Sequence, residues 1–180
     1  MASIIKNRAV IDDAWQVVRA AEDGALPAVD ALAAGKVLVP FAWWQAERAA
    51  RVAAKPKDEV GVWLAPRSEP AELAADFGAT SLIAVEFPGF ADGRGYSIAR
   101  LLRERHGWTG ELRAIGDVLR DQLLYMSRVG FDAFAVRADK DIHDALNAFA
   151  EFTQRYQGAF DEPVPLFRRR GATPDAKVSA

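Results

Sequence analysis

The fold is decided by residues 81–115, which read SLIAVEFPGFADGRGYSIARLLRERHGWTGELRAI. Residues 81–85 and 111–115 are short runs dominated by apolar side chains, whereas residues 96–106 carry apolar side chains at helical spacing. A buried strand, a helix and a second strand in this order are typical of a βαβ unit, in which the two strands lie parallel.

The same unit recurs on both sides of this stretch. The predicted strands are residues 37–40, 60–64, 81–85, 111–115 and 131–136. The predicted helices are residues 41–54, 69–77, 96–106, 118–129 and 141–156. Asp117 is the predicted N-cap of the helix at 118–129, and Gly130 is the residue expected to end it. The pattern predicts an α/β fold with a mostly parallel sheet, either doubly wound or an open partial (β/α) barrel.

The helix at 96–106 has a clear division between its faces. The buried stripe is predicted to consist of Ile98, Leu101, Leu102 and Arg105, with Arg100, Arg103 and Glu104 turned away from it. These apolar side chains are expected to be core contacts.

The two ends of the chain differ from this regular middle. In residues 1–35, short strands are predicted at 3–6 and 9–11 around a turn at Asn7 and Arg8, and together they form a β-rich lead-in that covers an edge of the main sheet. Residues 161–180 combine three prolines with three consecutive arginines, which favours a flexible, solvated tail. The predicted organisation is one α/β domain over 1–160, with βα repeats over 36–160, followed by the tail.

Charge and hydropathy exclude several classes of function. The chain of 180 residues carries 23 Lys and Arg against 25 Asp and Glu, so no global basic field supports nucleic-acid binding. No apolar run approaches the roughly 20 residues of a membrane span, and the first residues do not have the pattern of a secretory signal. We therefore expect a cytoplasmic protein that binds neither nucleic acid nor membrane; the sequence leaves open whether it forms a homo-oligomer.

Cysteine is absent, and histidine occurs only as His106 and His143. The chain thus lacks the thiolates of an all-cysteine iron–sulfur site, a dithiol couple or a cysteine-type zinc site. The sequence predicts no metal site and no cofactor, and it leaves open a bound flavin.

One loop after a predicted strand has the composition of an anion site. It contains Gly93, Arg94, Gly95, Tyr96 and Ser97. Glycines around an arginine at a helix start would let backbone N–H groups and a guanidinium approach an oxyanion. The alternative is a tight turn that needs positive φ, fixed by Asp92 and Arg94. A dinucleotide fingerprint is not supported, because Ile98 stands where its third glycine is required.

Charged side chains also follow the neighbouring predicted strands. Glu86, Asp117 and Arg137 each lie at or just after a strand end, and we expect them to converge with Arg94 on one mouth of the sheet. There they are candidate catalytic residues for acid/base chemistry on an anionic substrate. The alternative is that they cap helices and form surface ion pairs.

Three blocks of the sequence resemble a known family: VEFP (85–88) with DGRGYS (92–97), GELRAIGDVLRDQ (110–122) and GFDAF (130–134). The chain is similar to a bacterial family of unknown function whose members are commonly labelled oxidoreductases probably involved in sulfite reduction, because their genes neighbour those of assimilatory sulfite reductase. The resemblance implies a place in assimilatory sulfur metabolism.

Sulfite reduction moves several electrons and needs redox centres that this cysteine-free chain has no thiolates to hold. The sequence therefore favours an accessory protein that binds sulfite reductase, its electron donor or a small sulfur oxyanion. The alternatives are a small partial-barrel enzyme acting on an anionic metabolite, and a flavin-dependent oxidoreductase.

Overall fold

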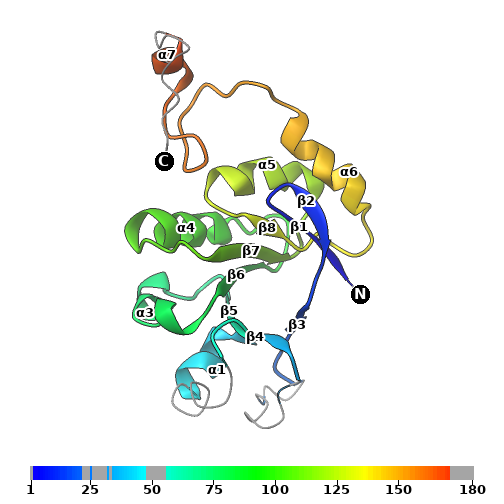
Figure 1. The fold of residues 1–180 in the computed structure, drawn as a ribbon, viewed down its shortest axis with the longest axis vertical. Helices are drawn as coiled ribbons and strands as arrows, with labels where there is room; N and C mark the ends of the chain where they lie inside the picture. The colour runs from blue at the N-terminus through cyan, green and yellow to red at the C-terminus, as the bar shows by residue number, and fades with distance from the viewer. Residues whose placement is uncertain (1, 22–24, 26–31, 33, 48–55, 171–180) are drawn as a thin grey trace.

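The structure, a computed structural model, describes residues 2–21, 25, 32, 34–47 and 56–170. Its strands are β1 (Ser3–Lys6), β2 (Ala9–Asp12), β3 (Trp15–Val17), β4 (Lys36–Pro40), β5 (Val60–Leu64), β6 (Leu82–Phe87), β7 (Glu111–Gly116) and β8 (Ala133–Phe134). They form one eight-stranded sheet in the spatial order β2-β1-β8-β7-β6-β5-β4-β3 (Figure 1).

The sheet is curled into a half-barrel. From β3 to β8, each strand pairs in parallel with the next strand along the chain. A doubly wound sheet requires the strand order to reverse, whereas these six strands keep chain order across the sheet. The predicted α/β class is confirmed, and the structure selects the partial barrel from the two arrangements that the sequence left open.

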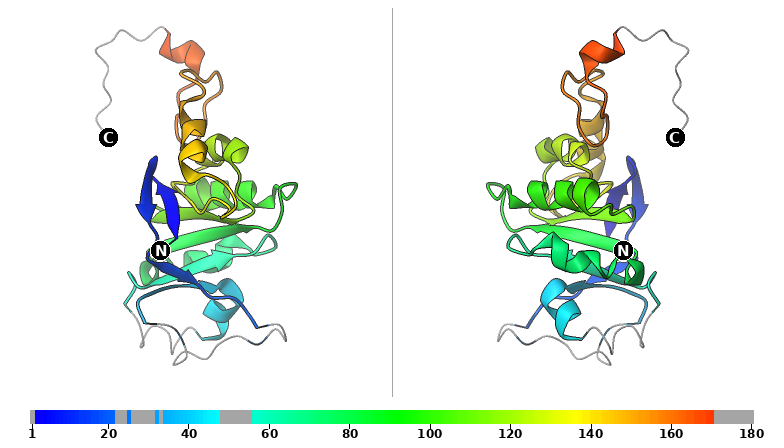
Figure 2. Two further views of the ribbon diagram at one scale, coloured as in Figure 1. Left: turned by 90° about the vertical axis from the view of Figure 1, so that its right-hand side faces the viewer. Right: turned by 90° about the vertical axis from the view of Figure 1, so that its left-hand side faces the viewer.

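Helices pack against one face of this sheet (Figures 1 and 2). They are α1 (Phe41–Ala46), α3 (Pro70–Ala74), α4 (Arg94–Arg100), α5 (Arg120–Arg128) and α6 (Ile142–Leu146), while α7 (Leu166–Arg169) lies farther from the sheet. The main core fills the space between helices and sheet, because alternate residues of each strand point toward the helices. Val62 of β5, and Val85 and Phe87 of β6, are fully buried there.

The opposite, concave face holds a smaller apolar cluster. Leu38, Leu82, Ala84 and Ile115 form it, with Trp15 and Trp63 packed against them. Gly61 is required at this point, because a Cβ atom there would lie 3.1 Å from the Trp15 ring and closer still to Leu38. The N-terminal segment therefore covers the concave face as well as the sheet edges.

That segment reaches both edges of the sheet. β1 pairs antiparallel with β8, and β3 pairs parallel with β4. Only Asp13 and Ala14 separate β2 from β3, so the two edge strands of the half-barrel are consecutive in the chain. The predicted strands at 3–6 and 9–11 are confirmed, and Asn7 and Arg8 form the turn between them.

A buried ion-pair cluster fastens this segment to the sheet. Arg113 is 2% exposed, and its Nη1 donates to both carboxylate oxygens of Asp13 at 2.9 and 3.0 Å. Its Nε donates to Glu111 at 2.8 Å, and Glu111 also accepts from Lys6 at 2.7 Å. Two cations and two carboxylates therefore pair off inside the half-barrel, where an unpaired charge would be costly.

Several predicted boundaries are wrong for local reasons. α5 begins at Arg120, and its N-cap is Leu119, whose N–H donates to the Gln122 side chain at 3.0 Å. Asp117 is therefore not the cap that the sequence predicted. Gly130, by contrast, has the left-handed φ of 114° expected where the helix ends.

The last predicted elements are shorter than expected. The strand predicted at 131–136 is reduced to the two residues of β8, and the helix predicted at 141–156 ends within α6 and a 3-10 turn at Asn147–Ala150. Residues 48–54 of the first predicted helix lie outside the described residues, as do residues 171–180 of the predicted tail. The described part of that tail includes α7, so it is not irregular throughout.

The helix at 96–106 differs most from its prediction. Leu101–Arg105 is a π-helical segment, in which the N–H of His106 donates to the carbonyl of Leu101, five residues earlier. Leu101 is 37% exposed and Arg103 is buried, the reverse of the predicted faces.

Candidate functional site

The carboxyl ends of the parallel strands meet at one edge of the half-barrel, which we call the rim. It consists of the residues that directly follow β3 to β8, and in α/β folds this is where ligands bind. Of the predicted site residues, Asp117 and Arg137 follow β7 and β8, Glu86 is the last residue but one of β6, and residues 93–97 open α4. The ion pairs that these residues form determine which of them can bind a ligand.

The predicted anion loop opens α4, and its arginine is engaged locally. Arg94 donates to Asp92 through Nε at 2.9 Å and Nη2 at 2.6 Å, and its backbone N–H donates to the same carboxylate at 3.2 Å. These hydrogen bonds from Arg94 lower the pKa of Asp92 to about 2. The Arg94 side chain is exposed, so an incoming oxyanion would compete with Asp92 for the guanidinium.

The glycines of this loop do not need positive φ. Gly93 has φ of −85°, and a Cβ there would lie 3.8 Å from the Tyr96 ring, an ordinary contact. Gly95 is buried, and a Cβ there would lie 2.6 Å from the ring of Phe87, so its missing side chain lets α4 pack on β6. Tyr96 stacks edge-on against Phe87, and burial raises the pKa of its phenol. Ser97 is exposed on the next turn.

The Glu86 side chain lies on the concave face of the sheet, close to the rim. Its Oε1 accepts from Arg19 Nη1 at 2.6 Å, and the Arg19 guanidinium lies 5.5 Å from the centre of the Trp63 ring. Trp63 is fixed in turn, since its indole N–H donates to the Val18 carbonyl at 3.0 Å. A cavity of about 350 Å³ opens beside Trp63, with Arg67 on its wall.

Asp117 and Arg137 lie together, whereas the sequence predicted that Glu86 and Arg94 would join them. Arg137 Nη1 donates to Asp117 at 2.8 Å, while Nε and Nη2 hold Asp139 at 2.6 and 2.9 Å. Hydrogen bonding to Asp139 raises the pKa of Arg137, and Arg137 lowers the pKa of Asp139. Glu86 and Arg94 do not contact this pair: Glu86 pairs with Arg19, and Arg94 pairs with Asp92.

The rim therefore consists of separate ion pairs. General acid/base catalysis needs a group whose pKa lies near the working pH, and the shifts at Asp92 and Asp139 move those carboxyls away from it. An exposed ion pair is weak, so one partner can be exchanged at little cost. An oxyanion at the rim would compete with these carboxylates for the guanidiniums of Arg94 and Arg137.

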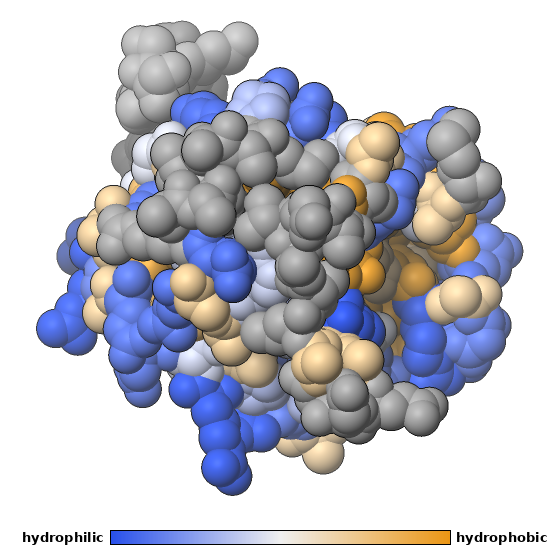
Figure 3. All heavy atoms as spheres, turned by 90° about the horizontal axis from the view of Figure 1, so that it is seen from below, coloured by the Kyte–Doolittle hydropathy of each residue, from blue (hydrophilic) through white to orange (hydrophobic). Residues whose placement is uncertain are grey.

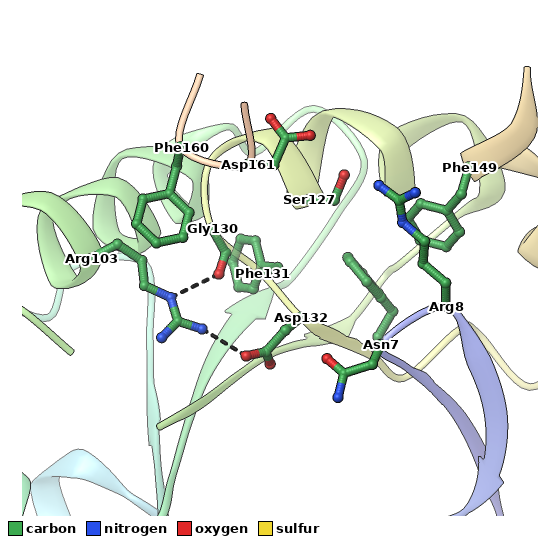
Figure 4. Close-up of a pocket in the computed structure, with 11 residues that line it drawn as sticks. Asn7, Arg8, Arg103, Ser127, Gly130, Phe131, Asp132, Phe149, Phe160 and Asp161 are labelled. Atoms are coloured by element: carbon green, nitrogen blue, oxygen red, sulfur yellow. Dashed lines mark hydrogen bonds and ion pairs between the residues drawn. The ribbon is translucent and has the colours of Figure 1, made fainter. Parts of the chain in front are cut away.

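A second cavity lies at the opposite edge of the sheet, and the sequence did not predict it. It has a volume of about 220 Å³, with Phe131, Phe149 and Phe160 among its walls (Figure 4). Arg103 and Asp132, joined at 2.8 Å, lie on one side and Arg8 on the other. The turn at Asn7 and Arg8 was predicted from the sequence, but its position beside this cavity follows only from the fold.

Two classes of site find no support in the described part of the chain. The described residues contain no group of three or more His, Cys, Asp or Glu side chains placed to hold a metal ion. Among these residues, none of the helices has the length and apolar character of a membrane span. Figure 3, a view from below Figure 1, shows hydrophilic and hydrophobic side chains side by side on the described part of this face.

Comparisons with known proteins give one match. The sequence model of a bacterial protein family of unknown function (DUF934) matches residues 61–167, which include the rim from β5 to β8 and most of the second cavity. Neither the curated proteins nor the solved structures contain a match to this chain.

Proposed function

Because the chain belongs to this bacterial family of unknown function (DUF934), we propose that it is an accessory protein of assimilatory sulfite reduction, the process that the sequence resemblance implies. In this proposal it binds sulfite reductase or its electron donor, and its rim binds a sulfur oxyanion. The reduction itself takes place on the partner, because this chain contains no cysteine to hold an iron–sulfur centre.

The observation that carries the proposal is a protruding segment with exposed aromatic side chains. Residues 151–170, which we call the arm, extend from α6 beyond α5 to α7, away from the sheet (Figures 1 and 2). Phe152, Tyr156 and Phe167 on the arm are 60%, 64% and 59% exposed, and Phe160 and Val164 are exposed too. Large apolar side chains gathered on one exposed segment are typical of a protein-binding surface.

Hydrogen bonds hold the arm in shape. The Phe160 N–H donates to the Arg128 carbonyl at 3.0 Å, which ties the arm to α5. Within the arm, Arg169 pairs with Glu162 and donates to the Arg155 carbonyl at 2.9 Å. A surface that is ordered before binding loses less conformational entropy when a partner docks. The arm is thus suited to docking rather than to acting as a loose tail.

Removing the aromatic side chains from the arm should abolish capture of the partner. We expect tagged protein from sulfate-grown cells to retain sulfite reductase or its electron donor. The triple variant Phe152→Ser, Tyr156→Ser and Phe167→Ser should retain at least tenfold less, since few interface residues dominate affinity and aromatic ones are prominent among them. Quantitative mass spectrometry of the captured proteins measures the difference.

The control is Phe90→Ser, because Phe90 is 57% exposed but lies in the loop before α4. This variant should capture the partner as the parent does, and both variants should keep the parent Tm, since exposed side chains contribute little to folding. The docking proposal fails if the parent captures neither the reductase nor its donor and deletion of the gene leaves growth on sulfate unchanged.

The rim makes a separate prediction with opposite signs for two neighbouring residues. Arg94→Ala should weaken sulfite and sulfate binding by roughly tenfold to a hundredfold, because it removes a charge-assisted hydrogen bond. Asp92→Asn should strengthen binding, since it removes the carboxylate that now occupies the Arg94 guanidinium. Calorimetric titration of both variants measures the affinities, and their Tm should stay close to that of the parent.

Equal anion affinity in all three proteins would show that the loop at residues 93–97 is not the oxyanion site. The partner-capture result is independent of this outcome, because the arm and the loop share no residue. The flavin alternative has its own test in the visible spectrum of the purified protein. A colourless preparation that binds no added flavin contradicts it.

A further inference from the structure

The turn between β1 and β2 holds an arginine in a backbone conformation that arginine rarely adopts. Asn7 and Arg8 have φ of 50° and 62°, and the pairing of Lys6 with Ala9 makes them a two-residue hairpin turn. Positive φ at both positions is the geometry of a type I′ turn, for which asparagine followed by glycine is preferred. An arginine with a left-handed backbone is unfavourable, and such outliers gather at functional sites.

The strained turn places the Arg8 side chain at the second cavity. In Figure 4 its guanidinium lies beside Phe149, 5.8 Å from the ring centre, on the side of the cavity opposite Arg103. Arg8 is exposed, and within the described residues no carboxylate pairs with it. Its guanidinium donors are therefore free to hold a ligand.

The other charges of this cavity are already neutralised. Arg103 donates to the carbonyls of Gly130, Trp108 and Gly110, and its remaining nitrogen pairs with Asp132. Asp161 pairs with Arg155 at 3.2 Å. Arg8 is thus the single cavity charge without a counter-ion in the described structure, and it is positive.

Apart from these charged side chains and the neutral Asn7 and Ser127, the wall is apolar. Phe131, Phe134 and Phe149 are at most 7% exposed, and Phe160 of the arm completes the aromatic lining. A volume of about 220 Å³ is smaller than that of most drug-sized ligand sites, so the ligand must be small. A free cation above an aromatic pocket matches a ligand with an apolar body and one negative group.

We infer that this cavity is a binding site for a small carboxylate with an aromatic or branched apolar body, and that Arg8 pairs with its carboxylate. The site lies at the edge of the sheet where the parallel strands begin, and the rim lies at the edge where they end. It is distinct from the oxyanion loop and from the exposed aromatic side chains of Phe152, Tyr156 and Phe167.

The test uses three probes on the full chain, with amide chemical shifts followed by NMR. Benzoate has both the ring and the charge, benzamide has the ring alone, and acetate has the charge alone. We expect benzoate to bind at least tenfold more tightly than either of the others, with shifts at Asn7, Gly130 and Asp132. Failure of benzoate to bind, or equal binding of benzamide, overturns the inference.

Variants at position 8 separate a ligand role from a structural one. Arg8→Gly should weaken benzoate binding at least tenfold without lowering Tm, because glycine relieves the left-handed strain and so offsets the lost contact with Phe149. Arg8→Lys should keep most of the affinity, and Arg94→Ala should keep all of it. Unchanged binding in Arg8→Gly, or lost binding together with a lower Tm, would mean that the arginine does not serve as the ligand contact.

Discussion

Arg113→Met is expected to lower the free energy of unfolding by about 3 to 5 kcal/mol, the cost of leaving a buried charge unpaired. Arg113 is 2% exposed, and the side chains of its partners Asp13 and Glu111 are each 10% exposed. Methionine fills much of the same space but leaves two carboxylates in the half-barrel with Lys6 as their remaining cation. Urea denaturation followed by circular dichroism measures the change.

Arg100→Met is the matched control, because Arg100 forms an exposed pair with Glu104 on the helix surface. Its effect should stay within about 0.5 kcal/mol. The double variant Arg113→Met with Asp13→Leu should recover part of the loss, since apolar replacements of a buried pair are often tolerated. A loss below about 1 kcal/mol in Arg113→Met would contradict the view that this cluster fastens the N-terminal segment.

The strands could be predicted from the sequence because burial on both faces makes each a continuous apolar run. β5 and β6 were predicted within two residues of their ends for this reason. The choice between a doubly wound sheet and a partial barrel could not be made, because both use the same βα units. That choice depends on which strands become neighbours, a long-range property.

Helix lengths were less predictable, because the amphipathic sequence pattern continues beyond the point where the helical backbone ends. The helix predicted to reach residue 156 becomes a 3-10 turn after Leu146, and residues 151–156 instead begin the arm. Good helix formers such as Ala148 and Glu151 give no sign of this change. Propensity is a weak signal that tertiary contacts override.

The positions of the candidate residues could be predicted from the sequence, but their ion-pair partners could not. Strand ends correctly located Glu86, Asp117 and Arg137 near one edge, and Asp117 with Arg137 did come together. Glu86 pairs instead with Arg19, a residue 67 positions away in the N-terminal segment. Neither hydrophobic period nor local spacing carries information about such a contact, so the separation of the rim into ion pairs emerges only from the fold.

Arg103→Met is expected to cost about 3 to 5 kcal/mol, comparable to Arg113→Met, although the sequence pattern assigned this residue to the solvent face. Arg103 points inward from the π-helical segment, its side chain is 6% exposed, and it makes four hydrogen bonds of 2.7 to 2.9 Å. Three of these satisfy backbone carbonyls, so the substitution leaves buried acceptors as well as Asp132 without their donor. Chemical denaturation of the full chain measures the loss.

Arg105→Met is the internal control for this prediction. Arg105 lies in the same π-helical segment but is exposed, and the sequence had assigned it to the buried stripe. Arg105→Met should change stability by no more than about 0.5 kcal/mol, whereas Arg103→Met has the large effect. The faces assigned from the sequence predict the reverse order, because they bury position 105 and expose position 103. The ranking of these two variants therefore tests which face of the helix is buried, and a larger loss for Arg105→Met would reject the arrangement seen in the structure.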